Sequence, residues 1–209
     1  MISRILYKLP LITNKTKITI SALLLALATL CSIAAPERLD RTVCAFAMFF
    51  SFIGDFLLNC TPHDKRPHWL LYSGAAFFMV SHLLYAAAYM FLISAGNFNF
   101  ATPGAYIAYA IMAVIFIASV TFIILTTGKN KIVMLLVFMV YLSMISMNFI
   151  TICSYSWSLK SISFIGSASF LISDCIIGIE TVFKIKNDTL RKLVWIFYPI
   201  GQFIIIVCR

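Results

Sequence analysis

The sequence is poor in charge. Only 11% of its 209 residues are Asp, Glu, Lys or Arg, whereas about 25% is usual in soluble domains. Hydrophobic residues make up 62% of the chain, with 19 Phe and a mean hydropathy of +1.01. This composition excludes a separate soluble catalytic or nucleotide-binding domain. It predicts an all-α fold, a polytopic transmembrane helical bundle in which lipid is the main solvent.

Common catalytic and metal-binding motifs are also missing. The six cysteines have no CxxC spacing and mostly lie within or at the ends of apolar runs, so we interpret them as small buried hydrophobes. The chain has neither a GxSxG nor an HExxH motif. A zinc hydrolase needs about three protein ligands, and only His82 lies deep within an apolar run. We therefore expect no metal and no cofactor.

Seven apolar segments are long enough to cross a bilayer. They cover residues 18–35, 42–60, 68–94, 104–127, 131–152, 159–183 and 192–208. Short polar breaks separate them, so neighbouring helices should pack antiparallel. The expected organisation is a basic cytosolic N-terminus at 1–17 followed by one transmembrane domain at 18–208. An eighth span is expected only if the N-terminal residues contribute one.

Lys and Arg are distributed unevenly between the two ends of these segments. Twelve of the 16 lie on the side that holds the N-terminus and four on the other. The positive-inside rule then places the N-terminus in the cytosol and the C-terminus outside. The same rule accounts for the net charge of +9, so no nucleic-acid partner is expected, and no obligate protein partner is evident. Short loops favour a bacterial inner membrane.

Three ionisable residues lie well inside the apolar runs: Asp55, His82 and Asp174. Such groups are costly in lipid and mark functional sites by default. Polar companions lie beside them or form helical stripes on the same or other segments, and the expected substrate-binding residues among them are Ser51, Tyr85, Tyr141, Ser173, Tyr198 and Gln202. Asn148 shares a face with Tyr141. Five segments each carry one such stripe. If the stripes face one another, they form a polar cavity that opens to the cytosolic side.

Other interpretations of these residues stay open at this point. A single buried Asp can serve only as a hydrogen-bonded link between helices, and His82 can be a buried imidazole bonded to a carboxylate. Intramembrane Asp and His also occur in proton relays, so a small transporter or lipid-binding membrane protein is the main rival to an enzyme. A metal-dependent lipid amidase is a third possibility, against which the shortage of deep histidines counts.

Several segments resemble the YhhN family of polytopic membrane proteins, which includes the lysoplasmalogenases. The segment 50–58, FSFIGDFLL, is similar to the family's S-x-x-G-D-x-x-L pattern. The segments 74–78, GAAFF, and 81–85, SHLLY, are similar to its G-x-x-x-F…H-x-x-Y helix. The segment 166–174, GSASFLISD, resembles its G-A-x-x-F-x-x-S-D pattern. The resemblance covers about residues 42 to 206. Family members usually have eight spans, and this chain departs from them in its short, charged N-terminus.

The resemblance implies hydrolysis of the vinyl-ether bond of a lysoplasmalogen, a lysophospholipid, to a fatty aldehyde and glycerophospho-ethanolamine or -choline. The residues suit this chemistry independently. It needs a proton donor and a base for water, and no covalent nucleophile or redox cofactor. One of Asp55 and Asp174 is expected to act as general acid and the other, ionised, to orient water. His82 is expected to orient them or relay a proton.

Overall fold

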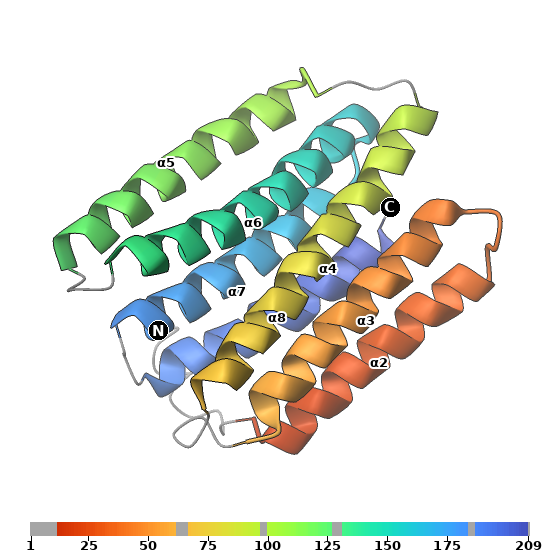
Figure 1. The fold of residues 1–209 in the computed structure, drawn as a ribbon. Coiled ribbons are helices and arrows are strands. Elements are labelled where there is room, and N and C mark those ends of the chain that lie inside the picture. The colour runs from red at the N-terminus through yellow and green to blue at the C-terminus, as the bar shows by residue number, and fades with distance from the viewer. Residues whose placement is uncertain (1–11, 62–66, 97–99, 127–130, 184–186, 209) are drawn as a thin grey trace, which may run out of the picture.

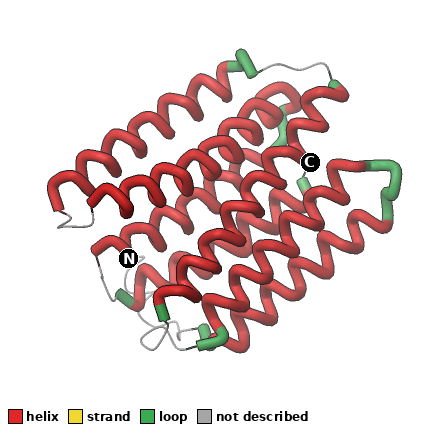
Figure 2. Tube along the Cα trace, viewed as in Figure 1, coloured by secondary structure: helices red, strands yellow, loops and turns green. Residues whose placement is uncertain are grey.

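A computed structural model of the chain describes residues 12–61, 67–96, 100–126, 131–183 and 187–208. These residues form seven helices and no strand (Figures 1 and 2). The helices are α2 (Asn14–Ile33), α3 (Leu39–Asn59), α4 (His68–Ala95), α5 (Pro103–Thr126), α6 (Lys131–Leu159), α7 (Ser163–Phe183) and α8 (Asp188–Val207). Each is long and apolar enough to span a membrane. The predicted all-helical, seven-span architecture is confirmed, while the alternative of an eighth span falls on residues 1–11, outside the described residues.

Capping side chains define where two of the helices begin. The Thr13 hydroxyl accepts the Thr16 backbone N–H at 3.2 Å, which starts α2 at Asn14 and puts Lys17 in its first turn. We had expected this helix to begin at residue 18, because charged residues usually lie outside a span. At α8, the Asn187 side chain accepts the Thr189 N–H at 2.9 Å.

Helix α6 runs seven residues beyond its predicted end at residue 152. Its last two turns hold Ser154, Ser156 and Ser158, which lower the hydropathy that the prediction relied on. Within the helix the Ser158 hydroxyl bonds to the Ser154 carbonyl one turn earlier, at 3.1 Å. The helix stops at Lys160, whose φ of 54° is left-handed, and the Ser161 N–H donates back to the Ser156 carbonyl at 3.0 Å.

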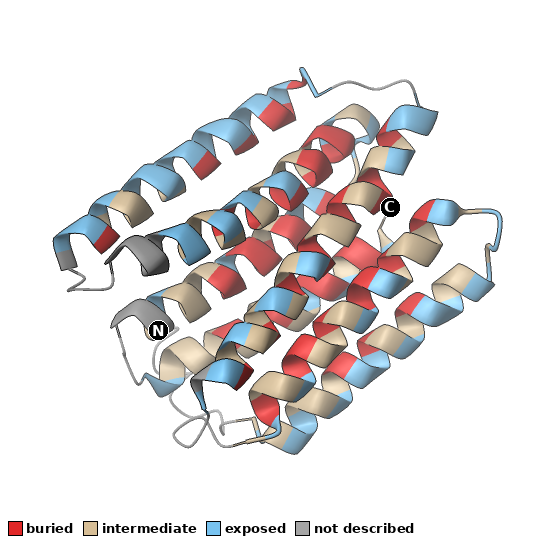
Figure 3. Ribbon diagram, viewed as in Figure 1, coloured by how far each residue is buried: buried red, intermediate tan, exposed pale blue. Residues whose placement is uncertain are grey.

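Six of the helices form a closed ring. Each contacts the next in the order α2, α3, α4, α6, α7, α8 and back to α2. α5 lies outside this ring against α6 (Figure 1). Buried residues face the interior of the ring, whereas α5 is largely exposed (Figure 3).

Glycines let two neighbouring helix pairs approach closely. A Cβ on Gly54 of α3 would lie 2.8 Å from the Phe78 ring and 3.2 Å from the Gly74 carbonyl of α4. A Cβ on Gly201 of α8 would lie 2.8 Å from both the Gly166 carbonyl and the Phe170 nitrogen of α7. Small residues serve membrane helices in this way, because close backbones gain van der Waals contact.

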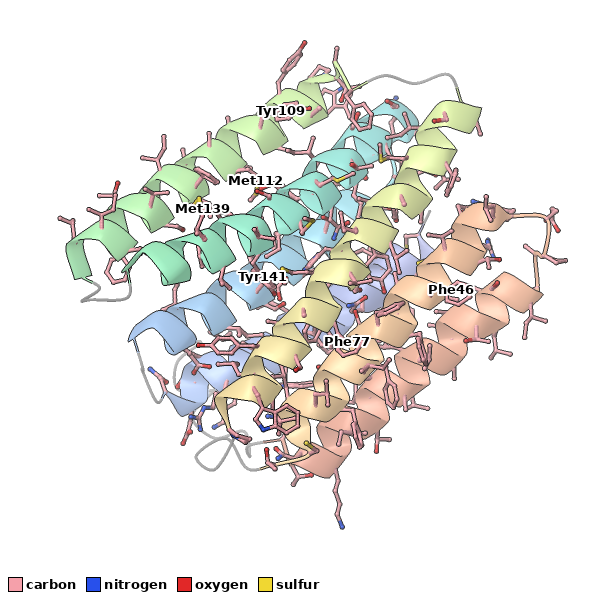
Figure 4. All side chains as sticks on the ribbon, viewed as in Figure 1. Phe46, Phe77, Tyr109, Met112, Met139 and Tyr141 are labelled. Carbon is pink, nitrogen blue, oxygen red and sulfur yellow. The ribbon has the colours of Figure 1, made fainter. Side chains whose placement is uncertain are left out.

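Two apolar clusters fill the bundle. The larger joins α2, α3, α4 and α8 with parts of α6 and α7, and contains Tyr85, Phe170 and Tyr198. The smaller joins α5, α6 and α7, and Met112 of α5 lies with Met139 near the seam between α5 and α6 (Figure 4). Tyr141 packs against both clusters.

Candidate active site

The ring brings the predicted site residues together from five helices. Eight of the nine are buried and Tyr141 is half-buried. They come from α3 (Ser51, Asp55), α4 (His82, Tyr85), α6 (Tyr141), α7 (Ser173, Asp174) and α8 (Tyr198, Gln202). The side chains form three hydrogen-bonded groups, which share aromatic neighbours.

The first group is built around His82, whose exposed fraction is 1%. Its Nε2 lies 2.8 Å from Oδ2 of Asp174. Its Nδ1 lies 3.0 Å from the amide nitrogen of Asn148. Because an amide N–H donates, Nδ1 is the acceptor, and the imidazole proton is then on Nε2, directed at Asp174. The Tyr141 hydroxyl is a further hydrogen-bond partner of the Asp174 carboxyl.

The second group is built around Asp55. Its Oδ2 accepts hydrogen bonds from the Tyr198 hydroxyl and the Ser21 hydroxyl, both at 2.5 Å. Ser21 comes from α2, so three helices meet at this carboxyl. Two hydroxyl donors on one oxygen suit an ionised carboxylate. Asp55 and Asp174 also lie near enough to interact electrostatically.

The third group carries no charge. The Tyr85 hydroxyl donates to Oε1 of Gln202 at 2.5 Å, and Nε2 of Gln202 donates to the Ser51 hydroxyl at 3.1 Å. The Ser51 and Ser81 hydroxyls lie 2.6 Å apart. This group links α3, α4 and α8.

Phe170 connects the three groups. Its ring stacks on the His82 imidazole, with centroids 4.4 Å apart and an interplanar angle of 28°. The rings of Tyr198 and Tyr85 meet it edge-on at 5.6 Å and 6.3 Å. All three polar groups therefore touch one fully buried aromatic ring. The apolar surroundings strengthen every charge interaction among them.

One predicted substrate-binding residue has a different local partner. The Ser173 hydroxyl donates to the Phe170 carbonyl of its own helix at 2.7 Å, and this bond does not link it to the three groups. Its role in binding substrate stays a prediction.

Four residues of this core were absent from the predicted site: Ser21, Ser81, Asn148 and Phe170. Asn148 was expected on the face of Tyr141, and both side chains do contact His82. Ser21 gave no sequence signal beyond being a hydroxyl in an apolar run. Its role depends on which helix α2 contacts, and a single sequence does not show that.

No three His, Cys, Asp or Glu side chains of the described residues lie together in a way that could hold a metal ion. A groove of about 290 Å³ lies away from the three groups. It is lined by Met90, Phe100, Tyr109, Met147, Ile150 and Thr151. The predicted cavity that opens to the cytosolic side stays a prediction.

Comparison with known proteins gives one match. Searches of curated proteins and of solved structures found none. The sequence model of the YhhN family matches residues 13–208, nearly the whole chain. That range includes all seven described helices and all three hydrogen-bonded groups. The chain therefore belongs to the YhhN family.

Proposed function

We propose that this protein is a membrane-embedded hydrolase that cleaves the vinyl-ether bond of lysoplasmalogens. The observation that carries the proposal is a pair of carboxyl groups buried in one helix ring with different partners. Asp55 accepts two hydroxyl donors, whereas Asp174 accepts the Nε2–H of His82. Paired carboxyls in unlike surroundings are the usual arrangement for separate acid and base roles.

The roles follow from these partners. Asp174, in its protonated form, is the proton donor. The Nε2–H of His82 and the Tyr141 hydroxyl stabilise the carboxylate that remains once the proton has left. We assign Asp55 as the ionised partner, because the hydroxyls of Ser21 and Tyr198 and the nearby positive charge of Lys17 favour its anion. Its negative charge stabilises the cationic intermediate and orients the attacking water.

The reaction proceeds by proton transfer and addition of water. Protonated Asp174 delivers its proton to the β-carbon of the vinyl ether, which leaves an oxocarbenium ion and the Asp174 carboxylate. Water adds to that ion and gives up a proton to Asp55, forming a hemiacetal. The hemiacetal collapses to a fatty aldehyde and a glycerol hydroxyl, and the proton on Asp55 returns through solvent to Asp174. The sum is one vinyl ether and one water converted to one aldehyde and one alcohol.

The localisation that fits this proposal is a bacterial inner membrane, with the N-terminus in the cytosol. The observed helices support an integral membrane protein, and the excess of Lys and Arg on the N-terminal side supports the orientation. The lysophospholipid is then supplied from the surrounding bilayer. No cofactor and no protein partner enter the proposed reaction.

The test presents detergent-purified protein with a vinyl-ether lysolipid and with its acyl-ester analogue, and assays aldehyde and fatty acid together. Asp55→Asn and Asp174→Asn should each lower aldehyde release by about 10²- to 10⁴-fold. A matched control is Asp40→Asn. Asp40 is equally buried, at 5% exposure, but pairs with Arg38 at 2.9 Å outside the three groups.

Each result has a distinct meaning. Aldehyde lost in the two site variants but retained in Asp40→Asn would support the proposal. Fatty acid from the ester, without aldehyde from the ether, would replace it with an ester hydrolase. Turnover of neither lipid by folded wild-type protein would favour the transporter or lipid-binding interpretation.

A further inference from the structure

A cation lies on an aromatic ring at the end of the bundle where α2 and α8 begin. Nζ of Lys17 lies 5.3 Å from the centroid of the Trp195 ring. The Trp195 ring meets the Tyr198 ring at 5.5 Å. The Tyr198 hydroxyl in turn donates to Asp55 at 2.5 Å. A continuous series of contacts therefore runs from Lys17 to the carboxylate of the proposed reaction centre.

Opposite charges surround this end of the bundle. Glu180 of α7 lies 3.9 Å from Nε of Arg191 on α8, and Arg191 also lies 3.6 Å from Asp188. Lys17 interacts electrostatically with both Glu180 and Asp55. Oε1 of Glu180, the oxygen that faces Arg191 at 3.9 Å, is buried and forms no hydrogen bond with the described residues. A buried carboxylate oxygen without a hydrogen bond can still accept one from a cationic ligand.

We propose that this Lys17–Trp195–Glu180 cluster binds the zwitterionic phosphodiester head group of the lysolipid. The phosphate pairs with Lys17, and the ammonium lies against Glu180. The inference rests on the proposed function, because it positions that function's substrate. It assigns a binding site that the reaction chemistry alone does not require.

The spacing of the cluster fits the length of the lipid. Lys17 and Ser21 are one helical turn apart on α2, about 6 Å along the axis, and Ser21 bonds to Asp55. In an extended lysoplasmalogen, five bonds join the ether oxygen to phosphorus, which span about 6 Å. A phosphate at Lys17 therefore brings the ether to the depth of Asp55.

The ring is least enclosed at the helix that carries Lys17. Only 17% of the apolar window of α2 is buried, against 33–44% for the other ring helices. The contact between α2 and α8 closes the ring, so a lipid that parts these two helices would reach Tyr198 and Asp55. The head group and the vinyl-ether bond then both enter between α2 and α8.

The neighbouring Lys15 supplies an internal comparison. Both lysines belong to the basic N-terminal side, which the positive-inside rule already explains. Lys15 is exposed, whereas Lys17 is half-buried on the Trp195 ring. If positive-inside topology were the whole explanation, the two would be equivalent. The cluster predicts that only Lys17 affects binding of the lipid.

The experiment uses a lipid that binds but does not react. A lysophosphoethanolamine with a saturated 1-O-alkyl chain has no double bond to protonate, so its dissociation constant from the full-length protein in detergent is independent of catalysis. The comparison ligand is the same 1-O-alkylglycerol without a head group. Wild-type protein should bind the phospholipid about tenfold more tightly, and Lys17→Gln should abolish that preference. Lys15→Gln should leave it unchanged.

A second variant tests the ammonium contact. Wild type should prefer the alkyl lysophosphoethanolamine to the anionic alkyl lysophosphoglycerol, and Glu180→Gln should reverse this order. Helical circular dichroism and size-exclusion behaviour establish that each variant is folded.

Three results would overturn the head-group site. They are equal affinity of wild type for the ligands with and without a head group, equal effects of Lys17→Gln and Lys15→Gln, and displacement of the lipid by inorganic phosphate as readily as by glycerophosphoethanolamine. The last would indicate a site for free anions. Hydrolysis that fails while the head-group preference holds would reject the proposed reaction and leave the binding site standing.

Discussion

Helices α3 and α5 are both long enough to cross a membrane, but they are built for different surroundings. α5 has no charged residue and is the most hydrophobic of the seven helices. Only 17% of its apolar window is buried, compared with 39% in α3. α3 places Ser51, Asp55 and Asn59 on one buried stripe. A helix that faces lipid over most of its circumference can be uniformly apolar. A helix of the ring, in contrast, must direct its polar side chains toward the interior of the ring.

This contrast indicates where function lies. The three hydrogen-bonded groups draw on α2, α3, α4, α6, α7 and α8, the six ring helices. α5 contributes no residue to the three groups, although it adds a second apolar cluster against α6. Substitutions at the hydrogen-bonded groups and close helix contacts of the ring should therefore alter catalysis or folding, and substitutions on the exposed side of α5 should do neither.

The largest difference should follow from removing the imidazole. His82→Gln should lower vinyl-ether hydrolysis by about 10²- to 10⁴-fold, because it removes the Nε2–H that stabilises the Asp174 carboxylate once its proton has left. Tyr106→Phe, on the exposed side of α5, should leave the rate unchanged. Initial rates of aldehyde release from folded protein measure both. Equal effects of the two variants would contradict the division between ring and α5.

The contact between α7 and α8 should tolerate less added volume than the contact between α7 and α6. Gly201→Ala places a methyl group 2.8 Å from backbone atoms of Gly166 and Phe170, and overpacking of this kind costs about 1–3 kcal/mol. At Gly178 the nearest atom, in the Phe138 ring, is 3.8 Å from a Cβ, so Gly178→Ala should be neutral or slightly stabilising. The midpoint of thermal unfolding in detergent distinguishes them. If Gly201→Ala is as stable as Gly178→Ala, the close approach of α7 and α8 is wrong.

Much of this architecture was predictable, because a bilayer imposes one dominant rule on sequence. Hydropathy located all seven helices, and the depth of Asp55, His82 and Asp174 within their runs indicated that the residues would be buried together. What hydropathy does not encode is the order of helices around the ring. For that reason the link from Ser21 to Asp55 could not be predicted.

The local hydrogen bonding of Ser and Thr hydroxyls was the second feature that the sequence could not predict. The hydroxyl of Ser173 satisfies its own helix backbone, and sequence does not distinguish such a hydroxyl from one that reaches across the bundle. The Ser158 hydroxyl behaves in the same way in the last turn of α6, beyond the predicted end of that helix. Ser and Thr lower hydropathy whether or not their hydroxyls are internally bonded.

A smaller effect should follow from removing the second partner of His82. Asn148→Leu takes away the amide that donates to Nδ1, and leaving a buried acceptor unpaired should slow turnover about tenfold. The chain has three histidines, so replacing His63 and His68 by Gln leaves His82 as the only imidazole for ¹⁵N NMR. In the protein that keeps Asn148, the spectrum should show the His82 proton on Nε2. In the protein that also carries Asn148→Leu, it should show a change of tautomer.

The control for this prediction lies on the same helix. Thr151→Val removes a hydroxyl that, among the described residues, bonds to the Met147 carbonyl of its own helix at 2.7 Å, so neither the rate nor the tautomer should change. An unchanged spectrum in Asn148→Leu would show that Asn148 does not set the protonation of His82, even if the rate fell for structural reasons.

The smallest effect should come from the outer face of α5. Ile117 is 66% exposed, and since lipid chains contact a shortened side chain as readily as a long one, Ile117→Ala should change the free energy of unfolding by less than about 0.5 kcal/mol. Met112, on the inner face of the same helix and 4% exposed, should lose more stability on replacement by Ala, because a cavity forms against α6. Unfolding midpoints in one detergent compare the two directly. A loss of stability at Ile117 as large as at Met112 would mean that the outer face of α5 packs against protein. In that case α5 could not serve as the lipid-facing helix with which the ring is compared.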